Sequence, residues 1–289
     1  MGVEKVKVSR FELLMDAGFG AQKAGDILIR AFARTNRDVY IEPMIPAEIS
    51  PPVRTRPALS GTMIRVADFN LTNIGNNTDL ILASHEIVLD RRLDDGEYSS
   101  DCRVFLDTAD EKLNKETYAQ VYARTKKDGI TIYPFEINDQ AKTLIKAMAG
   151  KGKNMYYLGM LSCIYNISED AIINEIKLIF GTKLKEEVLN KNIEIFHLGY
   201  KFDRAGIDFS FEIGESEVSK KEKILIDGNS AMSAGIIDAG IKLISGYPIT
   251  PASSILHSLA KTFPSYGGLV HQAEDEISAI GTAVGSYYG

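Results

Sequence analysis

Two short segments late in the sequence carry side chains that could do chemistry together. Residues 246–251 read Gly-Tyr-Pro-Ile-Thr-Pro, and the acids Glu274, Asp275 and Glu276 follow about twenty-five residues later. Proline fixes φ and donates no backbone hydrogen bond, so the two prolines around Thr250 predict a rigid turn between a strand and a helix. Such a turn would hold the Thr250 hydroxyl at the carboxyl edge of a sheet, where open α/β folds bind their ligands.

Each segment also has an ordinary structural explanation. Thr250 could be the N-cap of the following helix, with Pro251 as its first residue. The helix dipole favours acids in a first turn, so the three acids could simply stabilise the start of the helix expected from Asp275 onward. From spacing alone, a ligand role and a structural role both stay open.

Together the two segments resemble the alpha subunit of 2-oxoacid:ferredoxin oxidoreductases, the thiamine-diphosphate enzymes that decarboxylate 2-oxoacids onto coenzyme A. In that family the motif reads YPITP followed by serine, and here Ala252 takes the place of that serine. The resemblance implies that Thr250 is catalytic and donates a hydrogen bond to the 2-oxoacid. It also implies that Tyr247, Pro248 and Ile249 belong to the cofactor-binding site.

The resemblance further implies that one of the acids is the catalytic, cofactor-activating carboxylate. Thiamine enzymes need a buried carboxylate against N1′ of the aminopyrimidine ring, because its hydrogen bond favours the ring tautomer that removes the C2 proton. In the family this glutamate stands five residues before one helix glycine and nine before another. Gly281 and Gly285 fit Glu276 in that register, whereas alanines stand at those distances from Glu274. We therefore assign Glu276, with Glu274 as the alternative.

The N-terminal part resembles the family's gamma subunit, which many members carry fused ahead of the alpha subunit. Its loop at residues 18–23 reads Gly-Phe-Gly-Ala-Gln-Lys where the family has a pattern like G-x-G-G-Q-G, and prolines replace a double glycine near residue 51. A dinucleotide fingerprint would need a third glycine where Lys23 stands, with Glu42 as its acid. Tight strand-to-helix packing, or an anion or coenzyme A contact through Lys23, are the other uses of this loop.

The pattern of apolar residues predicts an α/β fold. It indicates strands near residues 11–15, 39–41, 61–66, 79–83, 103–106, 130–135, 224–226, 242–245 and 269–272, and helices near 24–33, 115–126, 139–149, 171–180, 183–192, 231–240, 253–261 and from 275 onward. The alternation is typical of a mostly parallel, layered sheet. We expect a gamma-like domain at 1–199, an exposed charged linker at 200–223, and the start of a pyrimidine-binding-type α/β domain at 224–289 that continues past the last residue.

Composition narrows the class of partner. The net charge of −6 and the pI near 5.4 argue against nucleic acid or an anionic membrane, and no apolar run could span a bilayer. Cys102 and Cys163 form no disulfide framework or iron–sulfur motif, which suits a reducing cytoplasm. The four histidines show no metal-ligand spacing. The resemblance places magnesium and the cofactor's diphosphate on a beta subunit, and an iron–sulfur cluster there or in a ferredoxin-like part.

These observations predict a subunit of a 2-oxoacid:ferredoxin oxidoreductase that is active only with its partner subunit. The gamma–alpha order of the fused parts is commonest among 2-oxoglutarate enzymes, so 2-oxoglutarate is the first substrate expected, followed by pyruvate. Ferredoxin is the expected electron acceptor and coenzyme A the expected acyl acceptor. The alternatives are a non-catalytic assembly subunit with the same fold and a dinucleotide-dependent dehydrogenase.

Overall fold

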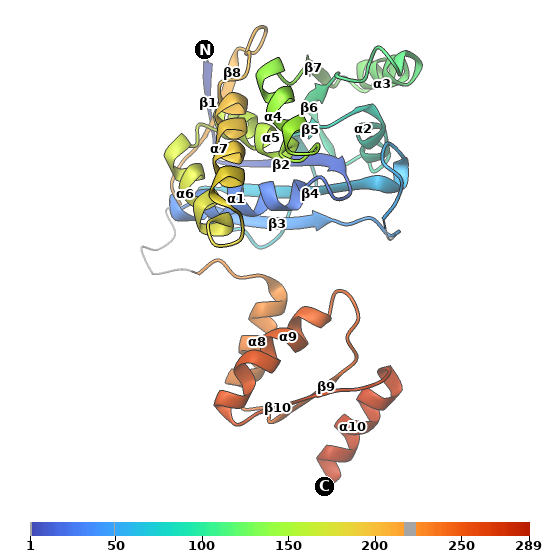
Figure 1. Cartoon of the computed structure of the whole chain (residues 1–289), viewed down its shortest axis with the longest axis vertical. Coiled ribbons are helices and arrows are strands. Elements are labelled where there is room, and N and C mark those ends of the chain that lie inside the picture. Colours follow the sequence, from blue (N-terminus) through green and yellow to red (C-terminus); the bar gives the residue numbers. More distant parts are fainter. Residues whose placement is uncertain (1, 49, 217–223) are drawn as a thin grey trace. The chain divides into compact units, whose positions relative to one another are not determined.

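The computed structural model describes residues 2–48, 50–216 and 224–289, which form two compact units (Figure 1). The first unit ends at Lys220 and the second begins at Lys221. Each unit is described here by itself.

A six-stranded sheet forms the centre of the first unit. Its strands, in spatial order, are β3 (Asp38–Met44), β4 (Leu59–Ala67), β2 (Val8–Asp16), β5 (Thr78–Ala83), β6 (Tyr98–Asp107) and β7 (Thr131–Phe135). The strands β2, β5, β6 and β7 are parallel, and β4 is antiparallel to both of its neighbours. Nearly all of β2 is buried, as expected for a strand covered on both faces. The predicted α/β class with a mostly parallel sheet is confirmed.

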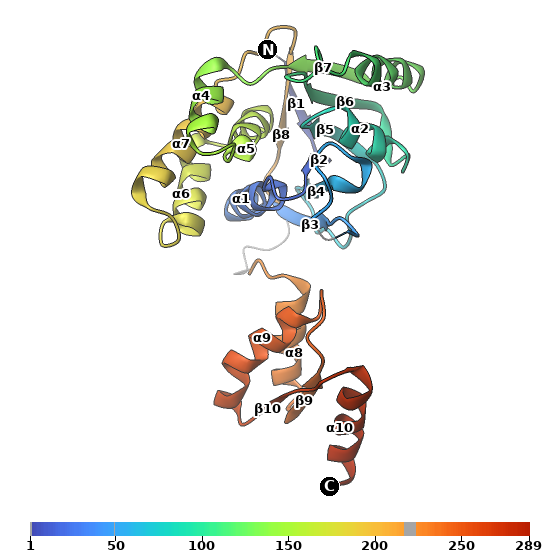
Figure 2. The same cartoon turned by 45° about the vertical axis from the view of Figure 1, so that its right-hand side comes forward.

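Helices cover both faces of this sheet (Figure 2). One face carries α1 (Ala21–Arg34), α4 (Asp139–Ala147), α5 (Lys153–Ile164), α6 (Glu169–Phe180) and α7 (Glu186–Tyr200), and the other carries α2 (Glu86–Leu93) and α3 (Lys115–Lys127). Successive side chains of β2 enter opposite cores: Phe11 and Leu13 belong to the larger cluster and Leu14 to the smaller one. Glycines let α5 and α7 meet closely, because a Cβ on Gly199 would lie 2.0 Å from a backbone oxygen of α5.

A second, two-stranded sheet corrects one prediction. Strand β1 (Gly2–Val6) pairs in parallel with β8 (Phe209–Ile213), whose three apolar side chains are buried. The Arg103 guanidinium lies 4.1 Å from the centroid of the Phe209 ring. The exposed linker predicted for 200–223 is therefore wrong at β8, because every residue of this strand except Glu212 is buried. Residues 217–223 lie outside the described part of the chain.

The second unit follows the predicted order of elements with one exception. Its elements are α8 (Gly228–Asp238), β9 (Leu243–Gly246), α9 (Ser253–Thr262), η2 (Phe263–Tyr266), β10 (Leu269–Gln272) and α10 (Glu276–Tyr288). Strands β9 and β10 pair in parallel. The strand predicted at 224–226 is wrong: this apolar run is exposed and pairs with no strand among the described residues. In the described ranges no helix is both long and apolar enough to cross a membrane.

A buried group of charges ties β2 to α2 in the first unit. The fully buried Glu12 accepts hydrogen bonds from Arg92 at 2.7 Å on each of its oxygens, and from Arg10 at 3.1 Å. Both arginines also reach the half-exposed Glu97. Burial alone would lower the pKa of Arg92, but the interactions with Glu12 hold it above its ordinary value. Glu12 thus balances two buried cations.

We predict that Glu12→Gln lowers the free energy of unfolding by about 3 kcal/mol, because it removes the fully buried carboxylate from two buried guanidinium groups and leaves them the half-exposed Glu97 to share. Urea denaturation followed by circular dichroism measures the change. The matched control is Glu187→Gln, which breaks the exposed pair with Lys191 and should leave the free energy of unfolding nearly unchanged. Equal losses in the two variants would contradict the role given to Glu12.

Candidate active site at the carboxyl edge of β9 and β10

The pairing of β9 with β10 brings the two chemically interesting segments to one edge. Gly246, the last residue of β9, lies opposite Gln272, the last residue of β10. The Ala273 amide then donates to the Gly246 carbonyl at 3.0 Å, which extends the pairing by one step. Because parallel strands end at the same edge, the turn after β9 and the acids after β10 both leave the sheet there.

The turn after β9 presents Thr250 to solvent. A backbone hydrogen bond of 3.0 Å from Ile249 to the Tyr247 carbonyl closes the turn, and Ser253 donates to the Ile249 carbonyl at 2.9 Å. The peptide bond between Thr250 and Pro251 is cis. The residue at the N-cap of α9 is Ala252, so the interpretation of Thr250 as a helix cap is wrong. The exposed Thr250 hydroxyl makes no hydrogen bond within the described residues.

The other predicted residues of the turn form an apolar rim. Ile249 is 51% exposed and Tyr247 36% exposed, while Pro248 is partly buried. Two large apolar side chains are therefore accessible to a ligand beside Thr250. They lie on the same edge as Thr250, where a flat apolar ring could pack on them.

The three acids after β10 have different surroundings. Asp275 is the N-cap of α10, and its carboxylate accepts from the Ser278 amide at 2.6 Å. Its side chain is therefore used within the helix. Glu276 begins the helix, and its exposed carboxylate has no hydrogen-bond partner in the described part of the chain. Glu274 is also exposed, but it precedes the cap and lies outside the helix.

Helix α10 has open space at its two glycines. A Cβ placed on Gly281 or Gly285 would meet no atom within 4 Å, and Ala279 is the buried residue through which the helix packs. Gly281 and Gly285 stand five and nine positions after Glu276, so at about 100° per residue they lie on the opposite side of the helix from its carboxylate. Among the described residues, no group of three or more His, Cys, Asp or Glu side chains could hold a metal ion.

In the glycine loop of the first unit, Gly20 packs closely against Asn154 of α5. Gly20 has a φ of +85° and precedes α1, and a Cβ there would lie 2.7 Å from the Asn154 amide nitrogen. That nitrogen donates to the Gly20 carbonyl at 3.1 Å. Lys23 pairs with Asp26 on the surface. Strand β4 separates β3 from β2, so the strand after α1 is not the adjacent parallel strand that a dinucleotide fingerprint requires.

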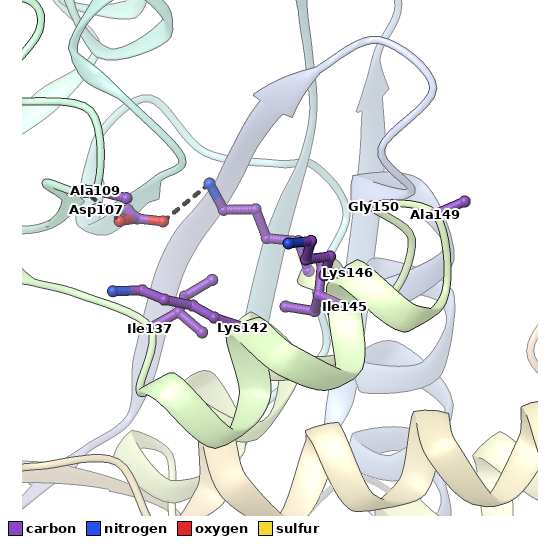
Figure 3. Close-up of a pocket in the computed structure, with 9 residues that line it drawn as sticks. Asp107, Ala109, Ile137, Lys142, Ile145, Lys146, Ala149 and Gly150 are labelled. Carbon is purple, nitrogen blue, oxygen red and sulfur yellow. Dashed lines mark hydrogen bonds and ion pairs between the residues drawn. The ribbon is translucent and has the colours of Figure 1, made fainter.

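A cavity of about 790 Å³ at the end of β6 was not predicted from the sequence (Figure 3). Its lining combines lysines of α4 and α5 with Ile137 and Ile145. The buried Asp107 accepts from Lys153 at 2.9 Å and from the Tyr157 hydroxyl at 2.7 Å. Burial, together with Asp107, raises the pKa of Tyr157. Only the tertiary fold brings these residues together, so spacing along the chain gave no signal for the cavity.

Comparison with known proteins identifies the family. The family model described as pyruvate ferredoxin/flavodoxin oxidoreductase matches residues 16–202, more than half of the chain. The chain belongs to this family. A second model, described as pyruvate flavodoxin/ferredoxin oxidoreductase, thiamine diphosphate-binding, matches residues 234–289. The resemblance seen in the sequence is confirmed, and the turn and the acids after β10 both fall within the second match.

Relatives of the oxidoreductase family match between about a fifth and nearly all of this chain. The 2-oxoglutarate oxidoreductase subunit KorA of Mycobacterium tuberculosis is 28% identical over 95% of this chain and 44% of its own length. The 2-oxoglutarate synthase subunit KorA of Archaeoglobus fulgidus is 46% identical, over 22% of this chain and 19% of its own length. The 2-oxoglutarate:ferredoxin oxidoreductase of Magnetococcus marinus, solved with 2-oxoglutarate, coenzyme A and succinyl-CoA bound, is 26% identical with a TM-score of 0.75, over 98% of this chain and 46% of that one. The chain thus spans less than half the length of these relatives.

The different surroundings of Thr250 and Asp275 predict different effects on stability. Thr250→Val should change the free energy of unfolding by less than about 0.5 kcal/mol, because no hydrogen bond is lost. Asp275→Ala should cost about 1 kcal/mol through loss of the N-cap of α10. Thermal unfolding followed by circular dichroism compares the two. A Thr250→Val loss as large as that of Asp275→Ala would mean that the hydroxyl has a structural partner.

Proposed function

We propose that this chain is a subunit of a thiamine-diphosphate-dependent 2-oxoacid:ferredoxin oxidoreductase. The enzyme would convert a 2-oxoacid, coenzyme A and oxidised ferredoxin to an acyl-coenzyme A, carbon dioxide and reduced ferredoxin. One arrangement supports this function above all others: a free hydroxyl, Thr250, and a free carboxylate, Glu276, leave the same edge of β9 and β10. They do so within the part that matches a thiamine diphosphate-binding model.

The substrate proposed first is 2-oxoglutarate. The relatives that match almost the whole chain bear that name, and one of them was solved with 2-oxoglutarate and coenzyme A. Pyruvate is the next candidate, since the name of the family model begins with it.

Each residue of the edge has a proposed role. The Glu276 carboxylate would accept a hydrogen bond from N1′ of the aminopyrimidine ring and hold that proton in place. Thr250 would donate its hydroxyl hydrogen to an oxygen of the 2-oxoacid and orient it. Tyr247, Pro248 and Ile249 would contact the ring and exclude water. When bound, thiamine diphosphate supplies the nucleophilic carbon that attacks the 2-oxoacid.

The remaining parts of the catalyst are proposed to lie on other polypeptides. Mg²⁺ is usually bound through one or two carboxylates together with the phosphates of its ligand. A beta subunit would supply the magnesium and diphosphate site together with an iron–sulfur cluster, and ferredoxin would accept the electrons. The thiols of Cys102 and Cys163 are both free, which agrees with a reducing cytoplasm as the place of action.

One observation favours a second candidate, a non-catalytic assembly subunit with the same fold. The glycine loop departs from the family pattern, and its Gly20 and Lys23 have intramolecular partners. A unit that lost its ligand could still hold the complex together. The variants below distinguish the two candidates.

We predict that Glu276→Gln in the assembled enzyme lowers turnover of the 2-oxoacid by about 10²- to 10⁴-fold without impairing assembly, because a neutral amide cannot hold the N1′ proton. Steady-state turnover and size-exclusion chromatography measure the two effects. Glu274→Gln is the matched control and should keep near wild-type turnover. The reverse pattern would move the assignment to Glu274, and activity in both variants would favour an assembly role.

A second prediction concerns the chain alone. It should bind thiamine diphosphate with magnesium weakly or not at all, because most of the affinity comes from the ionised diphosphate and its metal. Isothermal titration calorimetry of the single chain, with and without the partner subunit, measures this. Micromolar binding by the chain alone would show that the diphosphate site is on this polypeptide.

A further inference from the structure

The side chain of Asn229 connects α8 to the turn that carries Thr250. Asn229 lies in the first turn of α8, and its amide nitrogen donates to the Pro251 carbonyl at 2.9 Å and to the Ser254 hydroxyl at 2.6 Å. Because the Pro251 carbonyl can only accept, the NH₂ group must face the turn. Both N–H groups of the Asn229 side chain therefore donate to this turn and the start of α9.

Asn229 is itself held firmly at the start of its helix. Asp227 caps α8 by accepting from the Ser230 amide at 2.9 Å and from the Ser230 hydroxyl at 2.7 Å. The hydrogen bonds from the side chain and the amide of Ser230 hold the pKa of Asp227 below its ordinary value. The buried Ser233 donates its hydroxyl to the Asn229 carbonyl at 2.9 Å. These hydrogen bonds fix the position of Asn229 at the start of α8.

The turn has few other restraints. Pro248 and Pro251 provide no amide hydrogen, and Thr250 makes no hydrogen bond among the described residues. The Ser254 hydroxyl also reaches the Pro251 carbonyl, at 3.3 Å, so that Asn229, Ser254 and Pro251 form a small triangle. Among the described residues outside the turn and α9, Asn229 is the one whose side chain forms a hydrogen bond to this turn.

We propose that Asn229 is a positioning residue for Thr250. The hydrogen bond from Asn229 would hold the Pro251 carbonyl in place. This would also hold Thr250, the preceding residue, with its hydroxyl toward the sheet edge that carries Glu276. This inference rests on the proposed function, since it assigns the turn a role in binding the 2-oxoacid. Asn229 acts through the turn and takes no direct part in the reaction.

The first test uses the assembled enzyme and the variant Asn229→Asp, which keeps the shape of the side chain and removes both donors. The expected result is a fall in kcat/KM for 2-oxoglutarate of about tenfold, the effect of roughly one net hydrogen bond. In a Thr250→Val background the same change should have less than about a twofold effect, because residues that act as one unit are not additive. The matched control, Asn76→Asp on an exposed loop of the first unit, should leave kcat/KM unchanged. Equal falls in both backgrounds would overturn the proposal.

The second test does not depend on activity. Hydrogen–deuterium exchange of the full chain should show at least about tenfold faster exchange for residues 247–254 in Asn229→Asp, with the α10 peptides unchanged. Unchanged exchange at the turn would overturn the proposal, whatever the kinetics. An assembled complex that turns over no 2-oxoacid would contradict the proposed function. Faster exchange at the turn in that complex would still support the role of Asn229 in positioning the turn.

Discussion

The parallel pairing of β9 with β10 is the constraint on which the candidate site depends. Gly246 opposite Gln272 sets where both strands end, and therefore where the turn and the acids begin. A slip of one residue would turn every side chain of one strand to the other face. Helix α9 helps to fix the arrangement, because Leu256 packs where a Cβ on Gly246 would lie, at 2.8 Å. Only glycine allows the helix to approach this closely at the last residue of the strand.

The sequence predicted which helices and strands surround the site, but it did not predict the contacts between them. The order β9, α9, β10 and α10 follows from apolar periodicity, and the family resemblance pointed to Thr250 and Glu276. The register of β9 against β10 cannot be predicted from the spacing of residues along the sequence. A threonine followed by proline resembles the start of a helix, but the hydrogen bond from Ile249 to the Tyr247 carbonyl closes the turn, and Ala252 becomes the N-cap of α9. The role of Asn229 has no signal in the sequence, because its partners Pro251 and Ser254 lie more than twenty positions away.

Errors elsewhere come from partners that lie far away along the chain. The charged residues around β8 are typical of a linker, whereas its pairing with β1 joins residues about two hundred positions apart. The run at 224–226 has the composition of a strand and lacks a neighbour among the described residues. The cavity beside Asp107 needs residues from β6, α4 and α5 at once. Local composition cannot report contacts of this kind.

A structure of the assembled enzyme with thiamine diphosphate bound would test most directly that this chain supplies the pyrimidine side of the site. We expect a Glu276 oxygen within hydrogen-bonding distance of N1′, about 2.6 to 3.2 Å, with the Thr250 hydroxyl facing the space for the 2-oxoacid. Glu274 at N1′, or a cofactor held away from the edge of β9 and β10, would contradict this account.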